Sequence, residues 1–111
     1  MVTIAALNNM FAEIYQDLQR DGIYPKKMIL FGSYAKGLPK QYSDVDIAII
    51  ADEFSGSRIL DHEKILHLYR KYIPAEFHTF STNDTVEDNP FLEEIYSTGK
   101  EWTPDHPLVW N

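Results

Sequence analysis

The feature that most constrains the fold of this chain is an alternation between helical and strand-like spacing of its apolar residues. In residues 3–21 they recur at steps of three and four, which places them on one face of a helix. Residues 27–31 and 45–51 are instead short, mostly apolar runs, as in buried strands, and the second is rich in β-branched side chains. A chain that alternates in this way predicts a small sheet covered by helices.

Local signals set the predicted boundaries. Thr3 suits the cap of the first helix and Gly22 its end, while Pro74 breaks a second helix and Pro90 suits the first turn of the last one. The second helix is expected to have one apolar side, made of Ile59, Leu60, Ile65, Leu66, Leu68 and Tyr69. The predicted order is helix 3–21, strand 27–31, short helix 33–36, strand 45–51, helix 57–72, strand 75–80 and a helix from 90 that ends at 99.

This order is typical of the α/β (α+β) class. The length of 111 residues is that of one ordinary domain, so we expect a single domain over residues 1–111. The C-terminal tail is interrupted by prolines and predicts no long regular structure. Its tryptophans, Trp102 and Trp110, are expected to cover the sheet or a partner surface.

Composition excludes several kinds of function. The chain has no cysteine, which rules out disulfides, zinc–thiolate sites and a cysteine nucleophile. A net charge of −7 is unsuited to direct nucleic-acid binding, because that relies on Lys and Arg against phosphates. The first residues lack the basic start and apolar core of a signal peptide, and no apolar run approaches the ~20 residues of a membrane span. We therefore expect a soluble, cytoplasmic protein.

A Gly-Ser pair, Gly32-Ser33, directly follows the first predicted strand and precedes the short helix. Glycine lets a backbone approach a ligand closely, and the free N–H groups of a strand-to-helix turn suit phosphate. Taken alone, the pair is also compatible with a plain tight turn. It is not the phosphate loop GxxxxGK[ST], because no Gly-Lys-Ser/Thr follows.

Two carboxylates, Asp44 and Asp46, stand at the beginning of the second predicted strand. Residues two apart on a strand point to the same face. Two adjacent carboxylates repel each other at neutral pH unless positive charge lies between them, and a divalent metal is the usual source. An isolated Asp-x-Asp is more often a solvated strand end or a turn cap.

The two features together are more specific than either alone. The positions that match the pattern G-S-x-A-x-G, a spacer and S-D-x-D are Gly32, Ser33, Ala35, Gly37, Ser43, Asp44 and Asp46. With this pattern, residues 28–50 resemble the catalytic core of the polymerase-β-like nucleotidyltransferases, especially their minimal, single-domain members. The resemblance implies a small mixed β-sheet flanked by helices.

The resemblance also implies the site. Asp44 and Asp46 would be catalytic and would hold two Mg²⁺ ions, with Glu76 as the third catalytic and metal-binding acid. Gly32 and Ser33 would bind the β- and γ-phosphates of ATP or another nucleoside triphosphate. Glu76 is alternatively an exposed strand-end carboxylate. His78, two residues later, either orients an acid or the acceptor or is a partly buried structural histidine.

The implied function is Mg²⁺-dependent transfer of a nucleoside monophosphate, AMP from ATP, to a hydroxyl of a macromolecule. Minimal members of the family frequently act as antitoxins that modify a helical HEPN-type toxin partner. The alternative is a binding module that neutralises such a partner by contact alone, and a third interpretation is a metal- or nucleotide-binding regulator. A homo-oligomer stays possible, and no residue that reads the base is identifiable.

Overall fold

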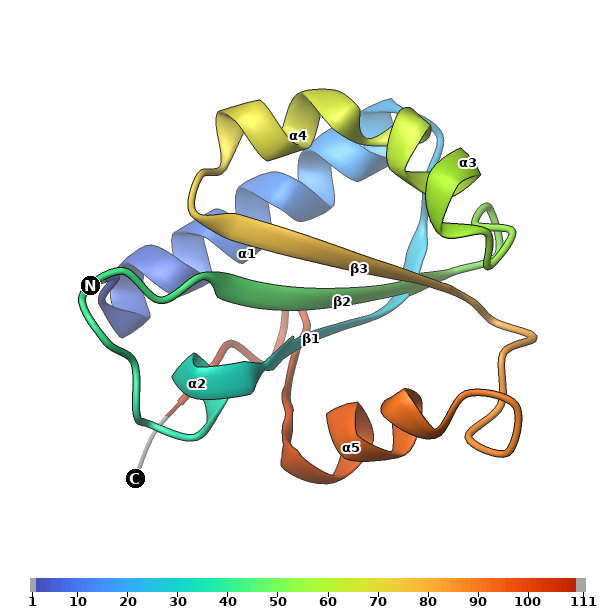
Figure 1. Ribbon diagram of the computed structural model, residues 1–111. Helices are drawn as coiled ribbons and strands as arrows, with labels where there is room; N and C mark the ends of the chain where they lie inside the picture. The colour runs from blue at the N-terminus through green and yellow to red at the C-terminus, as the bar shows by residue number, and fades with distance from the viewer. Residues whose placement is uncertain (1, 110–111) are drawn as a thin grey trace.

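The computed structural model describes residues 2–109, which form a four-stranded sheet with helices on both faces (Figure 1). In chain order the elements are α1 (Ile4–Arg20), β1 (Pro25–Phe31), α2 (Gly32–Ala35), β2 (Val45–Ala51), α3 (Arg58–Lys64), α4 (Leu66–Lys71), β3 (Ala75–Ser81), α5 (Pro90–Thr98) and β4 (Lys100–Trp102).

The sheet is mixed, with the strand order β3-β2-β1-β4. Strand β1 pairs antiparallel with both β2 and β4, whereas β2 and β3 run parallel. The register places Phe31 of β1 opposite Asp46 of β2, and Asp46 beside Glu76 of β3. The predicted fold class, a small mixed sheet flanked by helices, is therefore confirmed.

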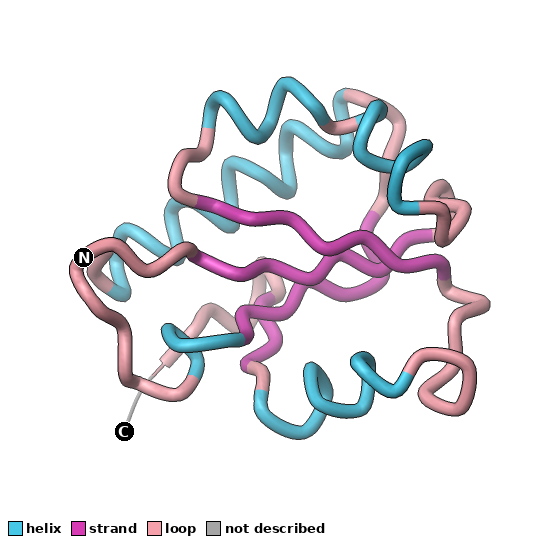
Figure 2. Tube along the Cα trace, in the orientation of Figure 1, coloured by secondary structure: helices cyan, strands magenta, loops and turns pink. Residues whose placement is uncertain are grey.

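Alternate residues of each strand enter two separate apolar clusters, because successive side chains of a strand point to opposite faces. Helices α1, α3 and α4 lie over one face and α5 lies on the other, while the short α2 stands at the end of the sheet, with its buried residues Tyr34 and Ala35 in the cluster of the first face (Figures 1 and 2). The first face carries the larger cluster, which includes Leu7, Phe11, Ile14, Leu18, Met28, Leu30, Ile47, Ile49, Leu68 and Phe77. The second face carries a smaller cluster made of Ile29, Phe31, Ala48, Ile50, Phe80, Leu92 and Ile95.

Helix α1 begins and ends where its capping residues predict. The Thr3 hydroxyl oxygen accepts a hydrogen bond from the backbone N–H of Ala6 at 3.1 Å, which satisfies one of the free donors of the first turn. Gly22 follows the helix with a φ of 80°, a left-handed conformation that glycine adopts without a Cβ penalty.

The prediction of one continuous helix over residues 57–72 is wrong. The helix is interrupted at Ile65, whose φ of −121° is not helical, so that α3 and α4 are separate. The predicted apolar side is also wrong in part, because Ile59, Leu60 and Leu66 have exposed fractions of 77%, 56% and 53%, whereas Ile65 and Leu68 are fully buried.

A buried carboxylate explains how α3 is oriented. Asp61 is 0% exposed, and its carboxylate accepts hydrogen bonds from the backbone N–H groups of Ser55 and Gly56 at 2.8 and 3.0 Å. These bonds turn the Asp61 side of α3 toward the protein, so Ile59 and Leu60 face outward. The interruption at Ile65 then lets the chain turn its apolar residues back to the core.

The tail contains a short strand that the proline-rich pattern did not predict. Strand β4 pairs with β1, and Trp102 at its end is buried, with ring centroids 6.0 Å from Phe11 and 5.7 Å from Tyr15 of α1. Trp110, the second tryptophan of the tail, lies outside the described residues. Within residues 2–109, none of the helices combines the length and the apolar character needed to cross a membrane.

Candidate active site

The candidate site lies where three strands meet at one end of the sheet. Because β1 is antiparallel to β2, the end of β1 and the start of α2 lie beside the start of β2. Because β3 is parallel to β2, its start lies there as well. The Gly-Ser pair, the Asp-x-Asp pair and the more distant Glu76 therefore converge at this edge.

The backbone of Gly32 and the side chain of Asp46 are in close contact. A Cβ built on Gly32 would lie 2.3 Å from the Asp46 carboxylate oxygen Oδ2, a separation that real atoms do not tolerate. Gly32 also has a φ of 74°, in the left-handed region that favours glycine. The position thus requires glycine for two reasons, and the Asp46 carboxylate occupies the space that any other residue's Cβ would fill.

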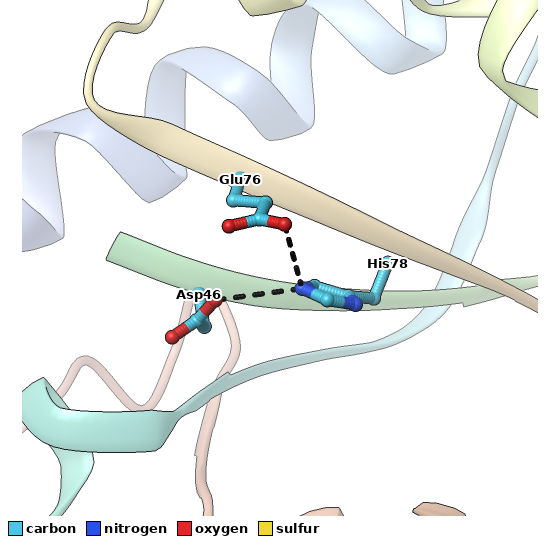
Figure 3. Close-up of side chains that lie close together, drawn as sticks. All are labelled: Asp46, Glu76 and His78. Carbon is cyan, nitrogen blue, oxygen red and sulfur yellow. Dashed lines mark ion pairs between the residues drawn. The ribbon is translucent and has the colours of Figure 1, made fainter. Parts of the chain in front are cut away.

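Asp46, Glu76 and His78 form a compact cluster on one face of β2 and β3 (Figure 3). Their potential metal-binding atoms all lie within 4.8 Å of one another. The His78 Nε2 atom is 3.4 Å from Asp46 Oδ1 and 4.0 Å from Glu76 Oε1. The side chains are 24%, 42% and 15% exposed for Asp46, Glu76 and His78, so the cluster is half-buried yet open to a ligand.

Aromatic rings hold the imidazole of His78 in place. Phe31, at the end of β1, meets the ring edge-on at a centroid distance of 4.9 Å, and Phe91 of α5 meets it at 5.9 Å. Phe31 and Phe91 also contact each other edge-on at 5.5 Å. Helix α5 therefore forms an apolar wall next to the acids.

The opposite face of β3 is anchored between Glu76 and His78. The hydroxyl of Tyr69 in α4 donates a hydrogen bond to the backbone carbonyl of Phe77 at 2.9 Å. Burial raises the pKa of Tyr69, so the hydroxyl keeps its proton and remains a donor at neutral pH. The backbone that presents Glu76 and His78 is thus fixed by a contact on the closed face of the sheet.

Two predicted site residues lie at the margin of this cluster. Asp44 is exposed in the segment just before β2, and its carboxylate is not part of the group formed by Asp46, Glu76 and His78. Ser33 is partly buried in α2, directly after Gly32. The structure thus places Asp46 beside both Gly32 and Glu76, and it adds His78 to them.

A cleft of about 280 Å³ opens beside His78, along the outer edge of β3. Arg58 at the start of α3 and Asp84 and Asp88 in the segment before α5 contribute charged groups to its wall. Nothing in the sequence pointed to this cleft, because its residues come from three distant segments that carry no common motif.

The donor set fits a divalent cation. Two carboxylates and an imidazole nitrogen within 4.8 Å of one another are groups that bind divalent metals. The buried Nε2 of His78 has no hydrogen-bond partner within residues 2–109, so the cluster contains a polar atom with unused bonding capacity. The net charge of −7 adds to the attraction for a cation.

Comparison with known proteins agrees with this architecture. The family model described as "Nucleotidyltransferase domain" matches residues 10–97, which is most of the chain. The chain therefore belongs to the nucleotidyltransferase domain family, and the resemblance predicted from the Gly-Ser and Asp-x-Asp pattern is confirmed.

One named relative is similar to this chain over part of its length. A protein of Methanocaldococcus jannaschii, whose name proposes a protein adenylyltransferase, is 38% identical over 68 residues, covering 60% of this chain. The match spans 46% of that relative, less than half of its length.

Two solved structures share the fold. A toxin–antitoxin crystallised with AMP-PNP has a TM-score of 0.60 at 21% identity, and a doubly Asp-to-Glu-substituted toxin–antitoxin MntA-HpeT has a TM-score of 0.57 at 19% identity. Each similarity covers 88% of this chain and 75% of the other chain.

Proposed function

We propose that this chain is a divalent-cation-dependent nucleotidyltransferase that transfers AMP from ATP to a hydroxyl group of a partner protein. In this proposal residues 1–111 act as one nucleotidyltransferase domain, and Mg²⁺ is the expected cation. The acceptor oxygen attacks the α-phosphorus, a new P–O bond forms, the bond to the β-phosphate breaks and pyrophosphate leaves.

The observation that carries this proposal is the contact between Gly32 and Asp46. It joins the turn proposed to hold phosphate to the acid proposed to hold metal, with no space for a side chain between them. A triphosphate seated on Gly32 and Ser33 would then lie directly beside the cluster of Asp46, Glu76 and His78.

Each residue has a distinct proposed role. The backbone at Gly32 and the hydroxyl of Ser33 bind the β- and γ-phosphates. Asp44, Asp46 and Glu76 hold two cations, with Asp44 free to approach because it is exposed in a segment outside the strand. Bound divalent cations neutralise the phosphates and lower the pKa of the acceptor hydroxyl. The wall formed by Phe31 and Phe91 limits the access of water from the α5 side.

The partner proposed for this chain is a helical HEPN-type toxin, with this chain as the antitoxin. Support comes from the names of similar proteins, since one proposes protein adenylylation and two structures are of toxin–antitoxin assemblies. In the second of these, the two substituted aspartates are two positions apart, the same spacing as Asp44 and Asp46.

The first test is a calorimetric titration of ATP, with and without Mg²⁺, followed by transfer of α-³²P-labelled AMP to the partner encoded by the neighbouring reading frame. Asp46→Asn should abolish Mg²⁺-dependent binding and lower transfer by at least about 10²-fold, because cation stabilisation is worth several kcal/mol in the transition state. The matched control is Asp52→Asn, an exposed acid after the other end of β2 that pairs with Lys26.

The outcomes separate the candidate functions. Loss of both binding and transfer in Asp46→Asn, but not in Asp52→Asn, supports the enzyme. If Asp46→Asn neutralises the partner as fully as the wild type, the chain acts by contact alone and the proposal is wrong.

A further inference from the structure

The imidazole of His78 has an unusual position among the side chains of the site. Its Nε2 atom is buried and makes no hydrogen bond within residues 2–109, although it is directed at Asp46 and Glu76 (Figure 3). The distances to the two carboxylates, 3.4 and 4.0 Å, are longer than the 2.7–3.2 Å typical of a hydrogen bond. A buried polar atom without a hydrogen-bond partner is unfavourable, so this arrangement is suited to a further ligand.

The separations are those of atoms that share a metal ion. Around an octahedral ion with bonds near 2.1 Å, adjacent ligand atoms lie about 3 Å apart and opposite ones about 4.2 Å apart. The two distances from Nε2 fall between these limits. The ring is also fixed in orientation by Phe31 and Phe91, as a ligand requires.

We propose that His78 binds, through Nε2, the same cation as Asp46 and Glu76, and that this nitrogen makes the site select Mn²⁺ over Mg²⁺. The inference rests on the proposed function for the existence of a cation site and changes the identity of the cation and one of its ligands. The proposed function assumes a site made only of carboxylates, which would bind Mg²⁺. The present inference adds a nitrogen ligand to that site.

The chemistry of the donors supports this choice. Mg²⁺ prefers oxygen ligands and keeps much of its water, whereas imidazole nitrogen favours transition metals. A set of two carboxylates and one imidazole, completed by phosphate or water oxygens, consists mostly of oxygen, which suits both Mg²⁺ and Mn²⁺. Its single nitrogen favours Mn²⁺, the transition metal of the two. Zn²⁺ sites are typically four-coordinate with two or more His or Cys ligands, whereas this cluster has a single imidazole and the chain has no cysteine.

The test is pulsed electron paramagnetic resonance on the full chain with Mn²⁺ and inorganic triphosphate. This probe contains no nitrogen, so any ¹⁴N coupling to the ion comes from the protein. The wild type should show the coupling of one imidazole nitrogen, and His78→Gln should lose it. In a calorimetric titration, His78→Gln should weaken Mn²⁺ binding by at least about tenfold and Mg²⁺ binding by less than about threefold.

The matched control is His67→Gln, which removes an exposed imidazole on α4 that pairs with Asp21 at 2.7 Å. This variant should keep the ¹⁴N coupling and the Mn²⁺ affinity of the wild type. Thermal unfolding of both variants confirms that they are folded, and the wild-type spectrum is informative without any substitution.

Two results would overturn the inference while leaving the proposed function intact. One is Mn²⁺ binding that depends on Asp46 but shows no nitrogen coupling in the wild type. The other is coupling that persists in His78→Gln. If neither Mn²⁺ nor Mg²⁺ binds in the presence of triphosphate, both the inference and the proposed function fail.

Discussion

The two faces of the sheet are built from the same strands but have different roles: one holds the core and the other carries the candidate site. The face under α1, α3 and α4 is closed by the larger apolar cluster, in which Phe11, Ile14, Leu18, Ile47 and Phe77 are fully buried. The face under α5 is covered only in part. Its cluster includes Phe31 and Ala48, and at its border Asp46, Glu76 and His78 are only partly buried.

The alternation of side chains along a strand makes this division possible. On β2, Asp46 lies between Val45 and Ile47, which are both 0% exposed and point to the closed face. The carboxylates of Asp46 and Glu76 lie within 4.8 Å of each other and oppose the folding of their own face, so the closed face must supply most of the stability. Changes on the closed face should therefore act on stability, and changes on the open face on binding.

The largest expected effect is on the closed face, at Phe11. Phe11→Ala should lower the free energy of unfolding by about 3–5 kcal/mol, because it removes a fully buried ring and leaves a cavity. Urea denaturation measures this loss. Phe11→Leu, a milder variant, should cost less and keep wild-type cation affinity, whereas a loss of affinity in the folded Leu variant would show that the two faces are not independent.

An intermediate effect is expected at the contact between the Gly-Ser turn and the acids. Gly32→Ala should lower stability by about 1–2 kcal/mol through its left-handed φ and weaken cation binding by about tenfold or more, since the new Cβ must displace the Asp46 carboxylate. Denaturation and calorimetric titration measure the two effects separately.

Gly22→Ala is the matched control for this change. Gly22 has a similar φ of 80°, but no atom of the described residues lies within 4 Å of the position of its Cβ. It should lose stability to a similar extent and keep full cation affinity. Equal affinity losses in the two variants would contradict the proposed role of the contact between Gly32 and Asp46.

The smallest effect concerns a polar network on the closed face. Asp17 of α1 is 9% exposed, and its carboxylate accepts hydrogen bonds from Lys71 Nζ at 2.7 Å and from the Tyr72 hydroxyl. Burial alone would raise the pKa of Asp17, but the hydrogen bonds from Lys71 and Tyr72 outweigh it, and the pKa is lowered. Burial and the neighbouring Asp17 raise the pKa of Tyr72 to about 12, so its hydroxyl remains a donor.

The lowered pKa of Asp17 makes the stability of the fold depend on pH. The network stabilises the fold above the unfolded-state pKa of Asp17, 3.8, and the contribution is lost as the pH falls through the lower folded-state pKa. Asp17→Asn should cost about 1 kcal/mol at neutral pH, and the difference from the wild type should shrink below pH 4. Urea denaturation across this range measures it, and a difference that stays constant with pH would refute the assignment.

Much of the fold was predictable because its signals are local. The spacing of apolar residues in α1, the apolar runs of β1 and β2, and the breaks at Pro74 and Gly99 each act within a few residues. The interruption at Ile65 was not predictable, because Ile65 continues the apolar spacing of the predicted helix and no glycine or proline marks the break. Strand β4 was missed because three residues form a strand only when β1 is there to pair with them.

The candidate site also contains residues that the sequence predicted and one whose role only the structure revealed. Gly32, Ser33, Asp44 and Asp46 form a pattern within 15 residues, so the sequence by itself determined the family and the kind of ligand expected. The place of His78 was decided only by the tertiary structure. The parallel register of β2 and β3 sets Ala48 beside His78, and Phe31 and Phe91 hold the imidazole toward Asp46 and Glu76. The physical reason is that a motif records residues close in the chain, whereas a metal ion is bound by atoms close in space.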